Sequence, residues 1–534
     1  METLGQLLDA TAARFPEREA VAYAAHGEVS VRLGWAELHA ASRLAATRLL
    51  AAGAGRGTRV ALLCSNRPEW LPIAFGAARL GAVLVPLSTL WKRDELAYAL
   101  AHADVELLLM LPRFLRHDYL ASVNEIVPGL ARAEPGRLHA RHAPALHRVV
   151  LLEGDAPGTE RWADLAASAD NARVDAAERA VSPRDPAVVF FTSGTTAQAK
   201  AVVHAHASLT TSARRVSDCL GIGPDDAWWG HMPLFWSGGL IMGALATMAG
   251  AGRVVLQEVV EPGPALALLE RERCTVMLGW HQAAPLLEHP DFPRRKLALK
   301  KGSGGTHPLA VRLLGADHVS VGMYGMTETA TCVTCARWDD PETIRVGTFG
   351  RPLAGMEVRI VDPETRRPVA PGETGEILVR GSTLMEGYLK VPRAETFDAE
   401  GFFRTGDLGR FDEAGCLHFA SRLKDVIKTA GVNVAASEVE EALARHPAVK
   451  SAHVVGVADA VRGENVVAFV VLRAGSTAGD GELRAFCQAS LASYKVPRHV
   501  FVIDEAALPR TGTGKIEKTA LRRAAEARLS GDRA

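Results

Sequence analysis

The sequence has no excess of charge of either sign, because 61 lysines and arginines balance 61 aspartates and glutamates. Proteins that bind nucleic acid normally carry a basic excess to neutralise phosphates, so we expect no nucleic-acid partner. Cysteine is scarce and odd in number, with seven residues scattered along 534. This predicts reduced thiols and no disulfide framework. The first residues lack a basic segment followed by an apolar run, so they do not resemble a signal peptide, and we expect a cytoplasmic protein.

One stretch is long and uncharged enough to raise the question of a membrane span. Residues 232–252 are 21 consecutive residues without a charge, a length that can cross a bilayer. Pro233, Ser237 and five glycines interrupt the stretch. We therefore expect a buried helix in a large α/β core and no integral membrane span.

The chain alternates between strand-like and helix-like segments. Short apolar runs such as 60–64 alternate with Ala/Leu/Arg-rich segments such as 35–52, which predicts parallel sheets covered by helices. Strands and tight turns over about 347–422 then predict a small β-rich, barrel-like subdomain. We expect an α/β fold: a large N-terminal domain of parallel α/β sheets over 1–423, which includes this subdomain, and a small C-terminal α+β domain over 424–534.

The strongest local signal is a loop of small residues after an apolar strand. Residues 190–200 read FFTSGTTAQAK, so hydroxyl-bearing residues lead from the strand to Lys200. Hydroxyls and backbone N–H groups of such a loop can surround phosphate oxygens, and the lysine adds compensating charge. The loop is not a Walker A motif, because Ala199 and Ala201 stand where glycine and Ser or Thr would be needed. Taken alone, the segment is equally typical of a Ser/Thr-rich turn without a ligand.

Four further segments follow in order: 324–329 (YGMTET), 403–408 (FRTGDL), 422–431 (RLKDVIKTAG) and 509–518 (PRTGTGKIEK). Together the five segments resemble the signature blocks of the adenylate-forming superfamily of acyl-CoA synthetases, luciferase-like enzymes and nonribosomal adenylation domains. The resemblance covers the chain from Leu4 to about Leu521 and is greatest to AMP-forming acyl-CoA synthetases. It implies an enzyme in which ATP and a carboxylate form an acyl-adenylate and pyrophosphate. Coenzyme A then takes the acyl group as a thioester.

The resemblance also implies roles for residues of the nucleotide site. Lys515 is the lysine needed for adenylation, Glu328 the Mg²⁺ ligand, Thr327 the hydroxyl beside the α-phosphate, and Lys200 the lysine of the phosphate loop. The other residues implied in binding the phosphates, adenine and ribose are Thr192, Ser193, Gly194, Thr195, Thr196, Gly304, Gly305, Tyr324, Gly325, Asp407 and Arg422. A carboxylate beside a phosphate-binding hydroxyl suits Mg²⁺, which prefers oxygen ligands and bridges substrate phosphates. The implied cofactors are ATP, Mg²⁺ and coenzyme A.

A mobile C-terminal domain is a further implication of the resemblance. This domain would rotate between the two half-reactions about a hinge at Lys424, and Gly431 would line the thiol channel. Rotation would withdraw Lys515 after adenylation and admit the bulky thiol.

The acyl side departs from the family pattern at Trp236. Amino-acid-activating relatives carry an aspartate here, and an ammonium left unpaired in a buried site costs about several kcal/mol. An amino-acid substrate is therefore not expected. We expect Trp236, Gly238 and Gly279 to line an apolar pocket that favours fatty, cyclic or aryl acids, while Met277 is either part of this pocket or core.

Alternatives to a CoA ligase remain. They are an acyl-AMP ligase that passes its acyl group to a separate carrier protein, a luciferase-like oxygenase, and a non-catalytic nucleotide-binding relative. The sequence ends 19 residues after Lys515, too few for a carrier domain, so we expect a free thiol as acceptor. The presence of Glu328, Asp407 and Lys515 favours catalysis. A zinc site at Cys332 and Cys335 is not expected without a second ligand pair. The oligomeric state is open, with a homodimer among the options.

Overall fold

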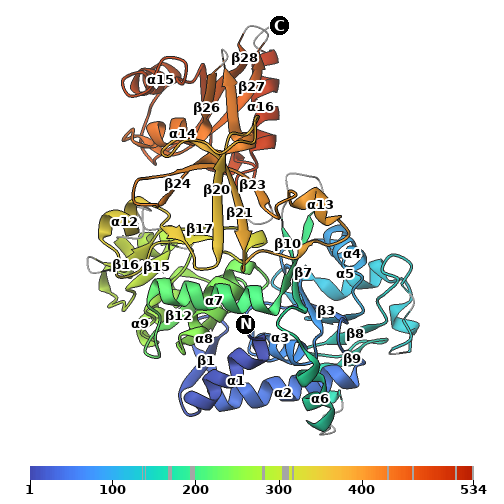
Figure 1. Ribbon diagram of the computed structural model, residues 1–534. Helices are drawn as coiled ribbons and strands as arrows, with labels where there is room; N and C mark the ends of the chain where they lie inside the picture. Colours follow the sequence, from blue (N-terminus) through green and yellow to red (C-terminus); the bar gives the residue numbers. More distant parts are fainter. Residues whose placement is uncertain are drawn as a thin grey trace. The chain divides into compact units, whose positions relative to one another are not determined.

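The computed structural model describes residues 1–134, 136–138, 140–165, 171–192, 199–279, 283–303, 312–315, 318–429, 432–459, 462–511 and 514–531. The chain divides into two units, which Figure 1 shows coloured along the sequence. Unit 1 comprises Met1–Val358 and Val379–Phe403, and unit 2 comprises Arg359–Leu378 and Arg404–Ala534.

Unit 1 contains two large sheets that are mainly parallel. The first has the order β16 (Val319–Val321), β15 (Lys301–Ser303), β14 (Val276–Met277), β12 (Ala227–Gly230), β13 (Arg253–Gln257), β1 (Glu19–Ala24), β2 (Val29–Gly34). The second has the order β22 (Gly387–Tyr388), β11 (Lys200–Ala205), β10 (Pro186–Thr192), β4 (Val83–Pro86), β3 (Arg59–Leu63), β5 (Leu107–Met110), β8 (Arg148–Leu151), β9 (Glu160–Arg161). The antiparallel neighbours are β1 with β2, β10 with β11 and β11 with β22.

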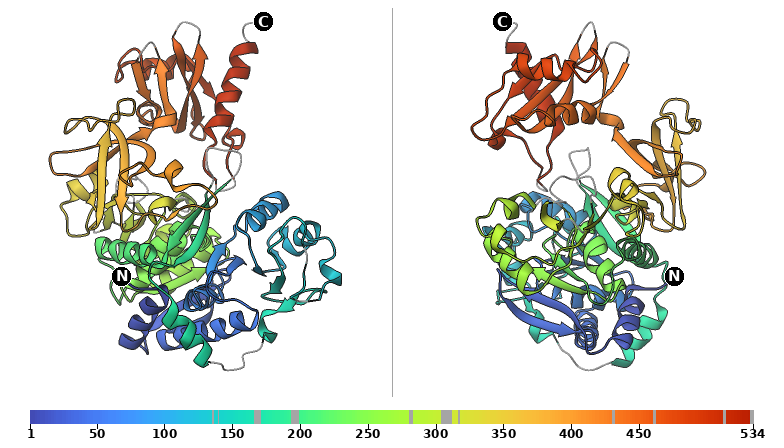
Figure 2. Two further views of the ribbon diagram at one scale, coloured as in Figure 1. Left: turned by 45° about the vertical axis from the view of Figure 1, so that its right-hand side comes forward. Right: turned by 90° about the vertical axis from the view of Figure 1, so that its left-hand side faces the viewer.

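Helices cover these sheets, as the two views of Figure 2 show. The helices of unit 1 are α1 (Leu4–Arg14), α2 (Trp35–Ala51), α3 (Trp70–Arg79), α4 (Arg93–His102), α5 (Tyr119–Ile126), α6 (Asn171–Ala180), α7 (His206–Leu220), α8 (Ala246–Ala249), α9 (Pro262–Arg271), α10 (Ala283–Glu288), α12 (Glu342–Gly347) and α13 (Arg393–Thr396). Unit 1 also contains two short sheets: β17 (Met323–Tyr324) with β18 (Thr334–Cys335) and β19 (Arg351–Pro352), and β6 (Arg113–Phe114) with β7 (His117–Asp118).

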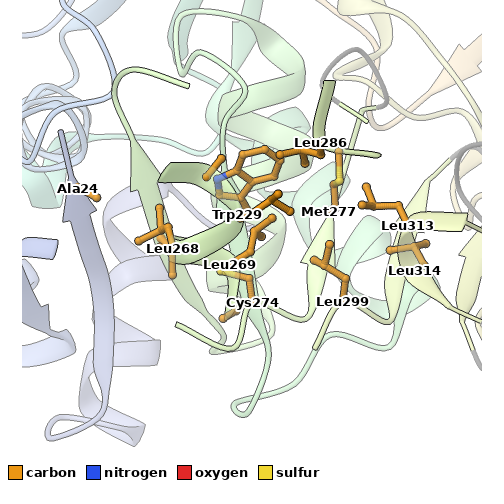
Figure 3. Close-up of a cluster of buried hydrophobic side chains, with 14 of the residues drawn as sticks. Ala24, Trp229, Leu268, Leu269, Cys274, Met277, Leu286, Leu299, Leu313 and Leu314 are labelled. Carbon is orange, nitrogen blue, oxygen red and sulfur yellow. The ribbon is translucent and has the colours of Figure 1, made fainter. Parts of the chain in front are cut away.

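A buried cluster on the first sheet settles one of the open alternatives. Met277 is fully buried together with Trp229 and Leu286, and Figure 3 shows the three side chains in one apolar cluster. Among the described residues, Met277 is therefore packed as a core residue. Its partners come from β12, α9 and α10, so this cluster joins the sheet to its helices.

The uncharged stretch 232–252 forms a short helical region. It contains a π-helix, η3 (Gly238–Leu245), that continues into α8. Most of its residues are buried, which agrees with the predicted buried helix. Among the described residues, no helix is both long and apolar enough to cross a membrane.

Strands β20 (Met356–Val361), β21 (Gly375–Gly381), β23 (Phe403–Phe411) and β24 (Leu417–Arg422) form a four-stranded sheet within the range predicted to be β-rich. Unit 2 continues with a five-stranded sheet of β25 (Val426–Thr429), β26 (Val432–Ala435), β27 (Val449–Asp459), β28 (Gly463–Leu472) and β29 (His499–Val502). Its helices are α14 (Ala436–Ala444), α15 (Asp480–Gln488) and α16 (Lys518–Gly531).

The five-stranded sheet is covered on both faces because its apolar residues alternate. Val454 and Ala468 are buried with residues of α14 and α15. Their neighbours Val455 and Phe469 are buried in a separate cluster with residues of α16. Successive strand residues point to opposite faces, so this pattern requires helices on both sides. The predicted α/β fold, with large parallel sheets in the N-terminal part and an α+β C-terminal part, is confirmed.

Candidate active site

The predicted phosphate loop connects two antiparallel strands at one side of the second sheet. Thr192 ends β10 and lies directly opposite Lys200, which begins β11. Ser193, Gly194, Thr195 and Thr196 lie outside the described residues. The hydroxyl of Tyr98 on α4 donates a hydrogen bond to the carbonyl oxygen of Ala199 at 3.0 Å. The strand pairing and this bond hold the lysine end of the loop to the sheet.

Lys200 is exposed, and its ammonium lies over an aromatic ring. The distance from Lys200 Nζ to the ring centroid of Tyr388 is 4.6 Å. Tyr388 belongs to β22, which pairs antiparallel with β11 so that Val202 lies opposite Tyr388. A lysine ammonium over a ring face is attracted by the negative face of the ring. The pairing of β22 with β11 therefore places the Tyr388 ring beneath the Lys200 ammonium.

Thr327 and Glu328 lie together on a short 3₁₀ turn, η5 (Thr327–Thr329), which follows β17. Glu328 is half-buried, and its Oε1 accepts a hydrogen bond from the hydroxyl of Tyr388 at 2.8 Å. Burial, and next the negative charge of Glu328, raise the pKa of Tyr388, so the phenol remains protonated. Lys200 thus contacts the ring face of Tyr388, and Glu328 contacts its hydroxyl.

Two polar side chains hold Thr327. The hydroxyls of Thr327 and Ser237 are 3.0 Å apart. His204, in β11, lies with its Nε2 2.7 Å from the carbonyl oxygen of Thr327. Burial lowers the pKa of His204 to about 4, so the ring is neutral near pH 7 and its Nε2–H donates to Thr327. The Nδ1 atom of the same ring lies 3.1 Å from the hydroxyl of Ser208.

The predicted adenine segment is partly described. Tyr324 is buried in β17, opposite Thr334 of β18. At Gly325 an added Cβ would lie 2.2 Å from the carbonyl oxygen of Thr331, so glycine is required by a close backbone approach. Gly304 and Gly305 lie outside the described residues.

The residues predicted for the acyl pocket lie at and near the start of η3. Trp236 is half-buried and meets Phe235 edge to face at a centroid distance of 5.7 Å. At Gly238 the nearest atoms to an added Cβ are 3.9 Å away or more, an ordinary van der Waals distance, so no close contact requires glycine at this position. Gly279 has φ +80°, a left-handed conformation that favours glycine. Its neighbour Trp280 lies outside the described residues.

The π-helix after Trp236 is held by close glycine contacts. An added Cβ at Gly239 would lie 2.1 Å from the carbonyl oxygen of Pro233, and one at Gly243 would lie 2.3 Å from the ring of Trp228. π-Helical turns are rare and frequently occur at functional sites. Close packing therefore requires glycine at 239 and 243 but not at 238.

Asn66 fixes the backbone that leads to Trp236. Its amide nitrogen donates to the carbonyl oxygens of Gly230 at 2.9 Å and Met232 at 3.0 Å, and its amide oxygen accepts from the N–H of Leu234 at 2.9 Å. Asn66 is 5% exposed, so all three bonds are shielded from water. Sequence reasoning missed this residue, although it follows β3 at a carboxyl end of a parallel strand, where ligand sites concentrate.

In unit 2 the two residues predicted to bind ribose lie together. Asp407 of β23 lies opposite Arg422 of β24, and Arg422 Nε is 3.3 Å from Asp407 Oδ1. Asp407 is buried, while the side chain of Arg422 is half-exposed. The backbone N–H of Asp407 donates to the hydroxyl of Thr405 at 3.0 Å. A buried carboxylate beside an arginine is suited to accept hydrogen bonds from hydroxyl groups.

Lys515 is exposed on a tight turn of unit 2. The N–H of Thr511 donates to the carbonyl oxygen of Lys515 at 2.8 Å, and Arg510 forms an antiparallel bridge with Ile516. Gly514 has φ +79°, the left-handed conformation that such a turn requires. Lys424 belongs to the short 3₁₀ turn η6 (Leu423–Asp425), and its side-chain position is not described. Gly431 lies outside the described residues.

A zinc site at the Cys332 and Cys335 pair finds no support. All seven cysteines are free and buried. Within the described parts of the chain, no group of three or more His, Cys, Asp or Glu side chains could hold a metal ion. A single carboxylate such as Glu328 instead suits Mg²⁺, which usually takes one or two carboxylates together with substrate phosphates. The residues present therefore fit Mg²⁺ bound with ATP.

A fold of two units, with a hydroxyl-rich loop, a Thr-Glu turn and a lysine turn, defines a nucleotide-dependent enzyme of the adenylate-forming class. The sequence profile of the family described as AMP-binding enzyme matches residues 8–389, and that of the AMP-binding enzyme C-terminal domain matches residues 438–515. This chain belongs to the AMP-binding enzyme family.

Known proteins similar over their full lengths support the same assignment. A Rhodococcus jostii CoA ligase, named for a methyl-dioxo-octahydroindenyl propanoyl group, is 35% identical over 540 residues, 97% of this chain and 98% of the relative. The mouse mitochondrial medium-chain acyl-CoA ligase ACSF2 is 29% identical over 546 residues, 99% of this chain and 88% of the relative. The ATP-bound crystal structure of MatB from Rhodopseudomonas palustris has a TM-score of 0.82 at 27% identity, covering 97% and 98% of the two chains. The predicted family and the predicted AMP-forming acid–CoA ligase activity are confirmed.

Proposed function

We propose that this enzyme, an AMP-forming acid–CoA ligase, activates a hydrophobic, uncharged carboxylic acid with ATP and passes the acyl group to coenzyme A. The observation that carries the proposal is that Tyr388 contacts Lys200 and Glu328, while Ser237 contacts Thr327, the chain neighbour of Glu328 on η5. These residues provide an ammonium, a carboxylate and a hydroxyl at one place, as binding of a nucleoside triphosphate requires.

The reaction proceeds in two steps. A carboxylate oxygen attacks the α-phosphorus of ATP, the bond to the bridging oxygen breaks, and pyrophosphate leaves. The coenzyme A thiolate then attacks the carbonyl carbon of the acyl-adenylate, and AMP leaves. The first step brings two anions together, so it depends on cations and N–H donors directed at the α-phosphate.

In unit 1, Thr192 and Lys200 at the two ends of the phosphate loop bind the β- and γ-phosphates. The hydroxyl of Thr327 donates a hydrogen bond to the α-phosphate. His204 holds the carbonyl oxygen of Thr327, and Ser237 contacts its hydroxyl. Glu328 would hold Mg²⁺, which would neutralise part of the phosphate charge. The backbone at Gly304 and Gly305, the ring of Tyr324 and the backbone at Gly325 form the adenine site, and Ser193, Gly194, Thr195 and Thr196 complete the phosphate loop.

In unit 2, Asp407 and Arg422 bind the ribose, and Lys515 neutralises charge between the substrate carboxylate and the α-phosphate. The support is the buried Asp407 beside Arg422 and the exposed ammonium on the glycine turn. The C-terminal domain, with its boundary at 423/424, turns about Lys424 so that Lys515 leaves and the thiol enters past Gly431. These assignments, like a homodimer and a cytoplasmic location, stay predictions.

The acid is bound beside Trp236, Gly238 and Gly279. Residues 232–245 carry no acidic or basic side chain, so this segment offers no partner for a charged substituent of the substrate. Burying a charge without a partner is costly, and an aromatic side chain suits an alkyl or ring substituent. Fatty, cyclic and aryl acids are the substrate class that these features support.

A pyrophosphate-release screen tests the proposal. Purified enzyme is given ATP, Mg²⁺ and a panel of linear, cyclic, aryl and amino acids, with and without coenzyme A. We expect pyrophosphate release with hydrophobic acids and an acyl-CoA product only when coenzyme A is present. Adenylation without transfer to coenzyme A would instead support the alternative, an acyl-AMP ligase for a separate carrier protein. Release with amino acids alone would contradict the proposed substrate class.

A further inference from the structure

Tyr388 contacts both charged residues of the proposed phosphate site in unit 1. Its hydroxyl donates to Glu328 Oε1 at 2.8 Å, and its ring lies 4.6 Å from Lys200 Nζ. The three residues are distant in the sequence and meet because β22 pairs with β11 at the edge of the second sheet. A single side chain therefore determines the positions of an anion and a cation that would act on the same nucleotide.

The backbone around Tyr388 is fixed on both sides of the residue. The N–H groups of Glu386 and Leu389 donate to the carbonyl oxygens of Val203 and Ala201, each at 2.8 Å. The N–H of Met385 also donates to the carbonyl oxygen of Glu328 at 2.9 Å. The segment that carries Tyr388 thus holds both the main chain and the side chain of Glu328. The Tyr388 ring packs at 6.5 Å from that of Phe403, which restricts its rotation.

The hydrogen bond leaves the carboxylate able to bind a metal. A carboxylate has two oxygens and about four lone-pair sites, and the phenol occupies one position on Oε1. Such outer hydrogen bonds orient metal-binding carboxylates and raise the affinity of the site for the metal. The ring face at the same time holds the Lys200 ammonium by electrostatic attraction, without using any of its N–H donors for a hydrogen bond to an oxygen.

We propose that Tyr388 is a positioning residue that orients Glu328 toward Mg²⁺ through its hydroxyl and Lys200 toward the ATP phosphates through its ring. This inference rests on the proposed function, because it assumes that Glu328 binds the metal and Lys200 the phosphates. The two functions of the tyrosine are chemically separate. Removal of the hydroxyl affects only the metal, whereas removal of the ring affects the metal and the nucleotide.

Binding of Mn²⁺, used as a paramagnetic probe in place of Mg²⁺, tests the inference without catalysis. The full-length enzyme is saturated with α,β-methylene-ATP, which cannot release pyrophosphate, and free Mn²⁺ is measured by electron paramagnetic resonance. Binding of the same nucleotide without metal is measured by calorimetry. The variants are Tyr388→Phe, Tyr388→Leu and Glu328→Gln. The control is Tyr119→Phe, which removes a buried hydroxyl that donates to the Thr89 carbonyl oxygen at 2.6 Å.

We expect Tyr388→Phe to weaken Mn²⁺ binding about 10-fold, the effect typical of losing an outer-shell hydrogen bond. It should leave metal-free nucleotide binding unchanged, because the ring remains under Lys200. Tyr388→Leu should weaken both, and Tyr119→Phe neither. Added Mg²⁺ at high concentration should restore pyrophosphate release by Tyr388→Phe, which a merely structural defect would not allow.

Three results separate the metal role of Glu328 from the positioning role of Tyr388. If Glu328→Gln keeps wild-type Mn²⁺ affinity, the metal role of Glu328 in the proposed function is wrong. If Glu328→Gln loses affinity but Tyr388→Phe does not, the proposed function stands and the role of Tyr388 is wrong. If Tyr388→Phe weakens metal-free nucleotide binding as much as Mn²⁺ binding, Tyr388 is a packing residue and the inference is overturned.

Discussion

The proposed nucleotide side and the proposed acyl side of unit 1 are built by different means, although they meet at the Ser237–Thr327 contact. On the nucleotide side, side chains hold side chains, as Tyr388 does for Glu328. On the acyl side, backbone position is set by the Asn66 amide and by the close approach at Gly239. A polar network provides fixed charges for one common reaction, whereas a backbone frame around Trp236 provides a shape that can vary with the substrate.

The difference predicts two kinds of variant. A change on the nucleotide side should slow adenylation of every acid by the same factor, because all acids react with the same ATP. A change on the acyl side should alter the ratio between acids and leave the affinity for ATP unchanged. The predictions that follow test this division.

The largest effect is expected from Lys515→Ala. Loss of an ammonium directed at the α-phosphate typically costs about 3 kcal/mol or more, so adenylation should fall about 10²-fold or more, equally for all acids. Thioester formation from supplied acyl-adenylate should be retained. Pyrophosphate release and thioester formation are measured separately, with Lys450→Ala, an exposed lysine paired with Glu505, as control. Unchanged pyrophosphate release would disprove the role of Lys515.

Asn66→Ala should lower the free energy of unfolding by about 3 kcal/mol, because it leaves three buried backbone groups without their partner. The loosened segment should also broaden acid selectivity while the KM for ATP stays constant. Chemical denaturation and an acid panel measure both effects. Asn124→Ala, on the surface of α5, removes an exposed hydrogen bond from a side-chain amide and should change neither the free energy of unfolding nor the acid selectivity. Equal loss for all acids would contradict the assignment of Asn66 to the acyl side.

Two buried histidines, His204 and His206, predict a loss of stability in acid. Burial lowers the pKa of His204 and of His206 from 6.5 to about 4. Both stay neutral in the folded protein while the unfolded chain binds protons below pH 6.5, so the free energy of unfolding falls as the pH drops from 6.5 toward 4. The loss is about 2 kcal/mol for each histidine by about pH 5.

Denaturation of His204→Gln at about pH 7 and pH 5 measures this effect. The variant should lose about 2 kcal/mol less than the wild type between the two conditions. His142→Gln, which replaces an exposed histidine, should lose as much as the wild type. If His204→Gln loses as much stability as the wild type, the pKa of His204 is not lowered in the folded protein.

The smallest effect is expected from Trp236→Ala, and it should appear only in the ratios of kcat/KM between different acids. Each methylene in a hydrophobic pocket is worth about 1–3 kcal/mol, so removal of the indole should shift kcat/KM about tenfold toward longer or bulkier acids. The KM for ATP should not change. Trp338→Ala, at an exposed tryptophan packed on Gly221, is the control. A uniform loss across acids, or a raised KM for ATP, would make Trp236 a core residue.

Local patterns predicted much of this protein. The apolar strand that ends at Thr192 and the β-strands that carry Asp407 and Arg422 lie where the sequence indicated, whereas the ligand roles of these residues stay predictions. These features could be predicted because each depends on residues close together in the chain, or on a segment order that the whole family shares. Met277 could not be assigned to pocket or core, because an apolar residue in a strand suits either.

By itself the sequence determined the family and the α/β architecture, and it indicated the segments that we propose to carry the chemistry. Only the tertiary structure decided which side chains position them: Tyr388 reaches Glu328 across 60 residues, and Asn66 reaches Leu234 across 168. Hydrogen bonds between distant segments depend on strand order and register, and they leave no spacing or periodicity in a single chain. The tyrosine and the asparagine therefore carry no local signal of their roles until β22 lies beside β11 and β3 ends near the loop after β12.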